Sequence, residues 1–195
     1  MGLRERKRAE MRQRIVAVAY RLFDERGYDE TTVEDIAEAA YVSPRTFYRQ
    51  FTSKDRTLPE IALPVLDRVV AALGPDASVP ELAARLAVEM EHALDHPHAQ
   101  VLVRLLREDP RLVEHAPSWR HLWACRMQAG FAASREGRTH PDDRLRATTA
   151  VTVVGLAIEE WLRGSASTIT DLVDESLRYL GAQHAGPPAD GRSAD

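Results

Sequence analysis

Residues 31–54 read TTVEDIAEAAYVSPRTFYRQFTSK, and two capping residues divide this stretch into two short helices. Thr32 and Ser43 each precede a short run whose apolar residues recur at helical spacing, which is typical of N-caps. Pro44 fits the first turn of the second helix, where a missing N–H costs nothing. Phe47 is predicted to face inward. The side chains left largely outward on this helix are Arg45, Thr46, Tyr48, Arg49 and Gln50.

Helical periodicity continues on both sides of this stretch. Before it, residues 4–26 form a predicted helix with one apolar face, which Gly27 ends. After it, residues 53–73 form a predicted helix that contains Pro59 and Pro64. Because a proline in a helix interior costs about 3 kcal/mol, we expect this helix to be bent or interrupted. Further helices are expected at about 78–94, from 98, from 110, from 117, at 142–163 and, capped by Thr170, at 170–180.

No stretch alternates apolar and polar residues for long enough to predict a strand. The predicted fold class is therefore all-α, with about nine helices. An N-terminal three-helix, helix-turn-helix domain is expected at residues 1–52, and a C-terminal helical bundle at residues 53–180. Residues 181–195 include a Gly-Pro-Pro run and are predicted to be a disordered tail.

The composition, 44% apolar and 29% charged residues, is ordinary for a soluble chain that buries a core. No run approaches the roughly 18 uncharged apolar residues of a membrane span, and no signal peptide is recognisable, so we predict a cytoplasmic protein without a membrane partner. Cys125 is the one cysteine, which excludes an internal disulfide. The net charge of −4 is unevenly distributed. Residues 1–56 carry 12 basic and 10 acidic side chains, whereas residues 57–195 carry 14 basic and 20 acidic side chains. A locally basic end on an acidic body is expected when only that end meets a polyanion.

Two short helices behind a basic amphipathic helix form the pattern of a helix-turn-helix DNA reader. Arg45 can donate two hydrogen bonds to a guanine, while Thr46 and Gln50 can reach base edges or phosphates. The Tyr48 hydroxyl suits a phosphate. Spacing alone also fits a plain helical corner, because many three-helix cores share such connections.

Residues 31–54 resemble, almost position for position, the DNA-binding segment of the TetR (tetracycline-repressor) family of bacterial transcriptional regulators. Residues 15–28 resemble the first helix of that family and the turn after it. The resemblance implies a homodimer that grips a palindromic operator on double-stranded DNA, with a C-terminal domain for ligand binding and dimerisation. It implies a repressor that a small apolar or acyl-type effector releases. At residues 105–110 and 161–164 the C-terminal part is weakly similar to mycofactocin-linked, acyl-CoA-responsive regulators.

The resemblance also implies roles for individual residues. Thr32, Tyr48 and Lys54 would contact phosphates, and Arg45 and Thr46 would lie in the major groove. The full set of predicted DNA-binding residues is Thr32, Val33, Ser43, Pro44, Arg45, Thr46, Tyr48, Arg49, Gln50 and Lys54. One departure from the family is Tyr41, which stands where glycine is usual. Glycine tolerates the left-handed backbone that such a turn favours, so Tyr41 implies either strain of roughly 1 kcal/mol or a slightly different turn.

The penultimate helix is apolar nearly all round, so it must be covered on both sides. The resemblance implies that this helix and the last one form a four-helix dimer interface, whereas a monomer with a buried central helix is the alternative. The predicted interface residues are Val153, Leu156, Leu172 and Leu177. Large apolar side chains spaced by four after residue 117 can line a ligand cavity or simply pack the core. The predicted pocket residues are Leu102, Arg104, Leu105, Trp119, Trp123, Met127 and Trp161, where Arg104 is either an anion partner or an outward-facing charge.

The sequence carries little sign of other site chemistry. His92, His96 and His98 lie close together, but Pro97 breaks the helix and no further ligand falls into register, so we predict no metal site. No phosphate-binding loop, nucleophile elbow or catalytic carboxylate pair is recognisable, which predicts neither an enzyme nor a cofactor. Two alternatives stay open: a sequence-independent DNA-packaging protein, which the acidic body disfavours, and an enzyme with a helical lumen.

Overall fold

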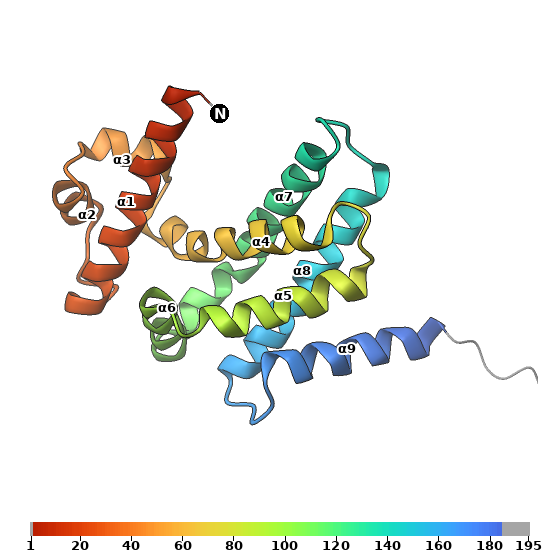
Figure 1. Ribbon diagram of the computed structural model, residues 1–195. Coiled ribbons are helices and arrows are strands. Elements are labelled where there is room, and N and C mark those ends of the chain that lie inside the picture. The colour runs from red at the N-terminus through yellow and green to blue at the C-terminus, as the bar shows by residue number, and fades with distance from the viewer. Residues whose placement is uncertain (1, 185–195) are drawn as a thin grey trace, which may run out of the picture.

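The computed structural model describes residues 2–184, which fold into nine α-helices and two 3-10 helices with no strand among them (Figure 1). The predicted all-α fold class is confirmed. The helices are α1 (Leu3–Arg26), α2 (Val33–Ala39), α3 (Pro44–Gln50), η1 (Lys54–Ala62), α4 (Leu63–Leu73), α5 (Val79–Ala93), α6 (Pro97–Glu108), η2 (Pro110–His115), α7 (Ala116–Ser134), α8 (Pro141–Leu162) and α9 (Ile169–His184).

The predicted caps of α2 and α3 are confirmed. The Asp35 amide donates to the Thr32 hydroxyl at 3.1 Å, and the Thr46 amide donates to the Ser43 hydroxyl at 3.2 Å. Between the two helices, Tyr41 has a left-handed φ of 54° and is 91% exposed, so of the two alternatives for this turn the strained left-handed backbone is the one adopted. Because no neighbouring packing offsets it, the strain of placing a Cβ there stays in the turn.

The prolines divide the predicted helix at residues 53–73, as expected. Pro59 lies inside η1, and Pro64 is the second residue of α4, where its missing N–H is harmless. The chain is thus a tight 3-10 helix up to Ala62 and an α-helix from Leu63 onward.

Two predictions at the C-terminal end are wrong. The last helix begins at Ile169, and Thr168 caps it: the Asp171 amide donates to the Thr168 hydroxyl at 3.0 Å. The backbone N–H of Thr170, the predicted cap, instead donates to Glu91 at 2.8 Å. The helix also continues to His184, so residues 181–184 of the predicted tail are helical. Residues 185–195 of that tail lie outside the described part of the chain.

The helices form a head, α1 to α3, and a body, α4 to α9, with one apolar core running through both (Figure 1). Tyr20, Phe23 and Phe47 fill the head, and Met127 and Phe131 lie fully buried in the body. The head contacts the body through α1, which packs against η1 and α6. In the body, α8 is packed between α7 on one side and α5 and α9 on the other.

Candidate nucleic-acid interface and apolar cavity

The outer face of α3 carries side chains that the protein leaves free. Arg45, Tyr48 and Arg49 are exposed, and neither arginine forms a hydrogen bond or ion pair with another described residue. On the opposite face Phe47 is fully buried and packs its ring against that of Phe51, with 5.6 Å between centroids. The helix is therefore fixed to the head on one side and presents two guanidinium groups and a phenol on the other.

Several other predicted DNA-binding residues are engaged within the protein. The Thr32 hydroxyl donates to the Asp35 carboxylate, and this bond is the main cause of the lowered pKa of Asp35. The Ser43 and Thr46 hydroxyls lie 3.0 Å apart, and Gln50 accepts a hydrogen bond from Arg8. Thr32, Ser43 and Pro44 are exposed, whereas Val33, Thr46 and Gln50 are half-buried.

Lys54 does not fit the phosphate contact that we predicted. Its ammonium donates to the carbonyls of Tyr28, Asp29 and Thr31 at 2.6, 3.3 and 2.9 Å, which uses all three N–H bonds. It also lies 4.2 Å from the centre of the Tyr28 ring, and burial lowers its pKa. Lys54 therefore closes the turn between α1 and α2 from within the protein.

Arg12 and Glu60 form a junction between α1, the end of α3 and η1. Arg12 donates to both carboxylate oxygens of Glu60, from Nε at 2.6 Å and from Nη2 at 2.7 Å. Its remaining Nη1 donates to the Gln50 carbonyl at 2.7 Å, and its guanidinium lies 4.1 Å from the centre of the Phe51 ring. Sequence reasoning missed this junction, because the two charges are 48 positions apart and no local pattern pairs them.

The carbonyls of η1 are held from both sides. The buried Tyr20 hydroxyl donates to the Leu58 carbonyl at 2.6 Å, and the Trp123 indole donates to the Pro59 carbonyl at 3.0 Å. Burial, and then the charge of Glu60, raise the pKa of Tyr20, which keeps its hydroxyl a donor. Tyr20 comes from α1 and Trp123 from α7, so both the head and the body donate hydrogen bonds to η1.

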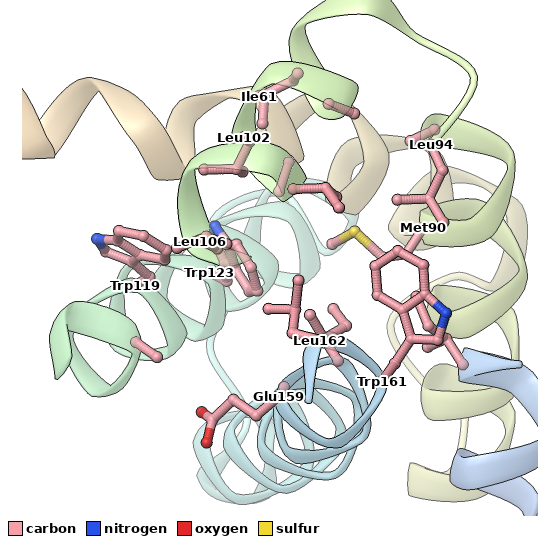
Figure 2. Close-up of a pocket in the computed structure, with 18 of the residues that line it drawn as sticks. Ile61, Met90, Leu94, Leu102, Leu106, Trp119, Trp123, Glu159, Trp161 and Leu162 are labelled. Atoms are coloured by element: carbon pink, nitrogen blue, oxygen red, sulfur yellow. The ribbon is translucent and has the colours of Figure 1, made fainter. Parts of the chain in front are cut away.

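An apolar cavity of about 110 Å³ lies in the body (Figure 2). Four predicted residues, Leu102, Trp119, Trp123 and Trp161, line it, with Trp119 and Trp123 on α7 and Trp161 across from them at the end of α8. The other large side chains that line it, which the sequence reasoning did not select, are Ile61, Val65, Met90, Leu94, Val103, Leu106, Val113, Ile158, Leu162 and Ile169.

The remaining three predicted pocket residues do not line the cavity. Met127 is fully buried in the core, and Leu105 lies about 100° around α6 from Leu106, which does face the cavity. Arg104 is exposed and donates to the Asp24 carboxylate of α1 at 2.8 Å. Of the two alternatives for Arg104, an anion partner in the pocket or an outward-facing charge, the second is correct.

One ion pair interrupts the apolar wall. Arg120 of α7 and Glu159 of α8 both line the cavity and are hydrogen-bonded to each other. Gly155 makes room for this pair, because a Cβ there would lie 2.6 Å from the Cδ of Arg120. The indole N–H of Trp119 is buried without a hydrogen-bond partner in the described structure.

Exposed large apolar side chains gather on α8 and α9. Of the seven found among residues 2–184, four lie on these two helices: Leu145, Leu156, Tyr179 and Leu180. The predicted interface residue Leu156 is 52% exposed, Leu172 and Leu177 are half-buried, and Val153 is 8% exposed. An open groove between the two helices includes Val153, Leu156 and Leu172.

The histidines have structural roles. His96 caps α6 by accepting from the His98 amide at 3.2 Å, and the His98 ring stacks on Tyr20 with 5.0 Å between centroids. No group of three or more potential metal ligands is found in the described range. Within residues 2–184, no helix combines the length and apolar character that crossing a bilayer demands.

Comparison with known proteins identifies the head. The family model described as "Bacterial regulatory proteins, tetR family" matches residues 15–61. TcmR of Streptomyces glaucescens is 50% identical over 62 residues, which are 32% of this chain but only 26% of TcmR. The putative mycofactocin biosynthesis transcriptional regulator MftR of Mycobacterium tuberculosis is 26% identical over 194 residues, or 91% of this chain and 92% of MftR. Residues 15–61 therefore carry the N-terminal domain of the TetR family.

The fold beyond the head is also similar to that of a TetR-family protein. Thermus thermophilus FadR, a TetR-family repressor solved in complex with lauroyl-CoA, superposes with a TM-score of 0.56 at 21% identity, over 94% of this chain and 100% of FadR. All three relatives are named transcriptional regulators or repressors. The chain is a DNA-binding transcriptional regulator.

Proposed function

We propose that the chain is a homodimeric repressor that binds a palindromic operator through α3 and leaves it when a small apolar or acyl-type effector enters the cavity of the body. The observation that carries the proposal is the face of α3 on which Arg45, Tyr48 and Arg49 stand free while Phe47 locks the opposite face. A regulator of this kind works where the chromosome lies, in the cytoplasm.

The free side chains of α3 match the chemistry of a DNA groove. A guanidinium donates in a fork that fits the O6 and N7 acceptors of guanine, which makes Arg45 the proposed base reader. Tyr48, whose ring stands edge-on to that of Phe47 at 5.8 Å, is stiff enough to hold its hydroxyl toward a phosphate. Arg49, one residue further along, supplies a second phosphate contact. Thr46 and Gln50 contribute less in this proposal, because each already has a partner in the protein.

The DNA-binding unit that we propose extends beyond residue 52. Lys54 closes the turn after α1, and the Leu58 carbonyl binds Tyr20 of α1, so the first half of η1 packs as part of the head. We place the change from head to body inside η1, between Leu58 and Ala62, and assign ligand binding and dimerisation to the helices that follow.

The α8 and α9 surface supports the proposed dimer. Soluble proteins rarely leave several large apolar side chains exposed side by side unless a partner covers them. Here Leu156 and Tyr179 are 52% and 65% exposed beside a groove whose floor includes Val153. A two-fold axis through this face pairs each patch with its own copy, and the same symmetry gives two α3 helices for the two halves of a palindrome.

The cavity supports an effector that is mainly apolar. Its walls are tryptophan, leucine, isoleucine and valine side chains, and a cavity of about 110 Å³ has room for a small apolar group without rearrangement. A longer acyl chain needs the walls to part. The Arg120–Glu159 pair is the polar contact available to an effector that carries one hydrogen-bonding group.

Arg45→Ala tests the proposal, with Arg144→Ala as the matched control, since Arg144 is exposed on α8 and also lacks a partner in the described chain. Binding is measured by gel shift and footprinting on the DNA upstream of the protein's own gene. We expect Arg45→Ala to weaken binding by about 1–3 kcal/mol per half-site and to relax the preference at one base pair, and Arg144→Ala to change neither. Equal affinity and base preference in the two variants would contradict the proposal.

A further inference from the structure

The first three turns of α1, residues 3–14, are strongly basic and project from the head. They carry six arginines and lysines and two glutamates in a chain whose net charge is −4. Every residue from Gly2 to Glu10 is exposed. The match to the family model begins at residue 15, so this segment is an addition to the part of the head that the model covers.

Contacts with α3 fix where this segment points. Arg12 binds the carbonyl of Gln50, the last residue of α3, and Arg8 donates from Nε to the side chain of Gln50 at 3.4 Å. Helix α1 therefore passes the end of α3 at residues 8–12, and the preceding residues extend beyond it (Figure 1). At 1.5 Å per residue, Arg4 lies about 6 Å further along the helix axis than Arg8.

The basic side chains of this extension form a stripe. At 100° per residue, Arg4, Lys7 and Arg8 fall on one side of α1, and Arg8 marks that side as the one next to α3. Neither Arg4 nor Lys7 pairs with another described residue, while Glu5 is engaged at the Gly2 amide at 2.8 Å. No described side chain neutralises the charge of Arg4 or Lys7, and the contact of Arg8 places the stripe beside Gln50, the residue after Arg49.

We propose that Arg4, Lys7 and Arg8 bind DNA phosphates outside the half-site that α3 reads, so that each protomer holds a longer duplex than its helix-turn-helix covers. This inference rests on the proposed DNA-binding function. The duplex is the occupant that fits, because its phosphates form a continuous row with one charge about every 1.7 Å of the helix axis. A stripe that adjoins the end of α3 meets that row as soon as α3 enters the groove.

The double variant Arg4→Gln/Lys7→Gln tests the inference. Glutamine keeps the helix propensity, and Arg8 stays in place to hold Gln50. The control is Arg138→Gln/Arg144→Gln, which removes the same charge from exposed positions of the body. The DNA probes are a duplex that the full-length protein selects from a random library, trimmed to its palindromic core, and the same core with ten extra base pairs on each side.

We expect the unmodified protein to bind the extended duplex more tightly than the core, and the double variant, which keeps Arg8, to lose most of this preference. Each lost phosphate contact lowers the slope of log affinity against log salt by about 0.9. The loss of two contacts in each of two protomers lowers the slope by about 3.6. The ratio of the affinity of the unmodified protein to that of the double variant on the extended duplex should therefore fall about a hundredfold between 50 and 200 mM salt. The control should keep the unmodified slope.

Three results would overturn the inference. If the double variant keeps the unmodified salt slope and the unmodified dependence on duplex length, Arg4 and Lys7 do not contact phosphates. The proposed function is tested separately by Arg45→Ala. An equal loss in the control reduces the effect to general charge. An unmodified protein that selects no duplex at all overturns both the inference and the proposed function.

Discussion

Replacing Glu60 by glutamine tests how the head is fixed to the rest of the chain. The Glu60 side chain is 7% exposed, and both of its carboxylate oxygens accept from Arg12, at 2.6 and 2.7 Å. Glutamine has nearly the same shape but keeps one acceptor oxygen and no charge. Its amide NH₂ would face the guanidinium of Arg12, so that two hydrogen-bond donors would oppose each other.

The expected cost follows from the burial of the two partners. Removing one partner of a fully buried ion pair costs about 3–5 kcal/mol, and a hydrogen bond to a charged group contributes about 1.5–3 kcal/mol. Arg12 is 32% exposed, so water can solvate it once the pair is lost. Glutamine retains one of the two hydrogen bonds. We therefore expect the free energy of unfolding to fall by about 1–2 kcal/mol.

Urea unfolding of four proteins gives the measurement: the unmodified chain, Glu60→Gln, Arg12→Gln and the double variant. Because the two side chains contact each other, their effects should be non-additive, with a coupling energy of about 1 kcal/mol. Glu34→Gln is the control, since Glu34 is an exposed acid of the head without a partner among the described residues. A coupling energy near zero, or an equal loss in the control, would refute the assignment of Arg12 and Glu60 as the junction.

Three further outcomes are expected from single substitutions. Tyr41→Gly should raise the free energy of unfolding by roughly 1 kcal/mol, because glycine adopts the observed φ of 54° without strain; a thermal melt that falls instead would contradict this. Leu156→Glu should convert a dimer into a monomer in analytical ultracentrifugation and weaken operator binding, whereas Ala133→Glu, exposed at the end of α7, should leave both unchanged. Burial alone would raise the pKa of Asp143, but the hydrogen bonds from Arg135, the His140 amide and Arg146 lower it below its ordinary value. The stability that the Asp143 carboxylate contributes is then present above about pH 4 and is lost as the pH falls through the lowered pKa. The deficit of Asp143→Asn in denaturant melts, about 2 kcal/mol at pH 7, should therefore shrink as the pH falls below about 4.

The features that the sequence predicts best are those set by neighbouring residues. Capping at Thr32 and Ser43, the broken helix at Pro59 and the left-handed turn at Tyr41 each depend on a few consecutive positions, and the structure has all of them. The misplaced cap of the last helix follows the same logic. An acidic residue three positions after Thr168, and none three after Thr170, is the sign of a capping box that favours the earlier threonine.

Partners that meet through the tertiary fold were beyond the sequence. Lys54 binds carbonyls more than twenty residues earlier in the chain, and Arg104 pairs with an aspartate 80 positions away. The sequence around a lysine or arginine does not show whether its side chain faces a phosphate, a carbonyl or water. The partner of such a side chain depends on which helices pack against each other, and the periodicity of the sequence does not predict that packing.

The cavity and the DNA-reading head share one structural segment. Ligand pockets commonly enclose roughly 300–1,000 Å³, so an effector larger than a small apolar group must push apart the walls of this cavity of about 110 Å³. Two of those walls are Ile61 of η1 and Trp123, and the Trp123 indole binds the Pro59 carbonyl of the same η1. The next residue along, Glu60, holds Arg12 and, through it, the end of α3. Because packed interiors do not yield locally without moving their neighbours, the volume available to an effector and the position of the recognition helix cannot be set independently.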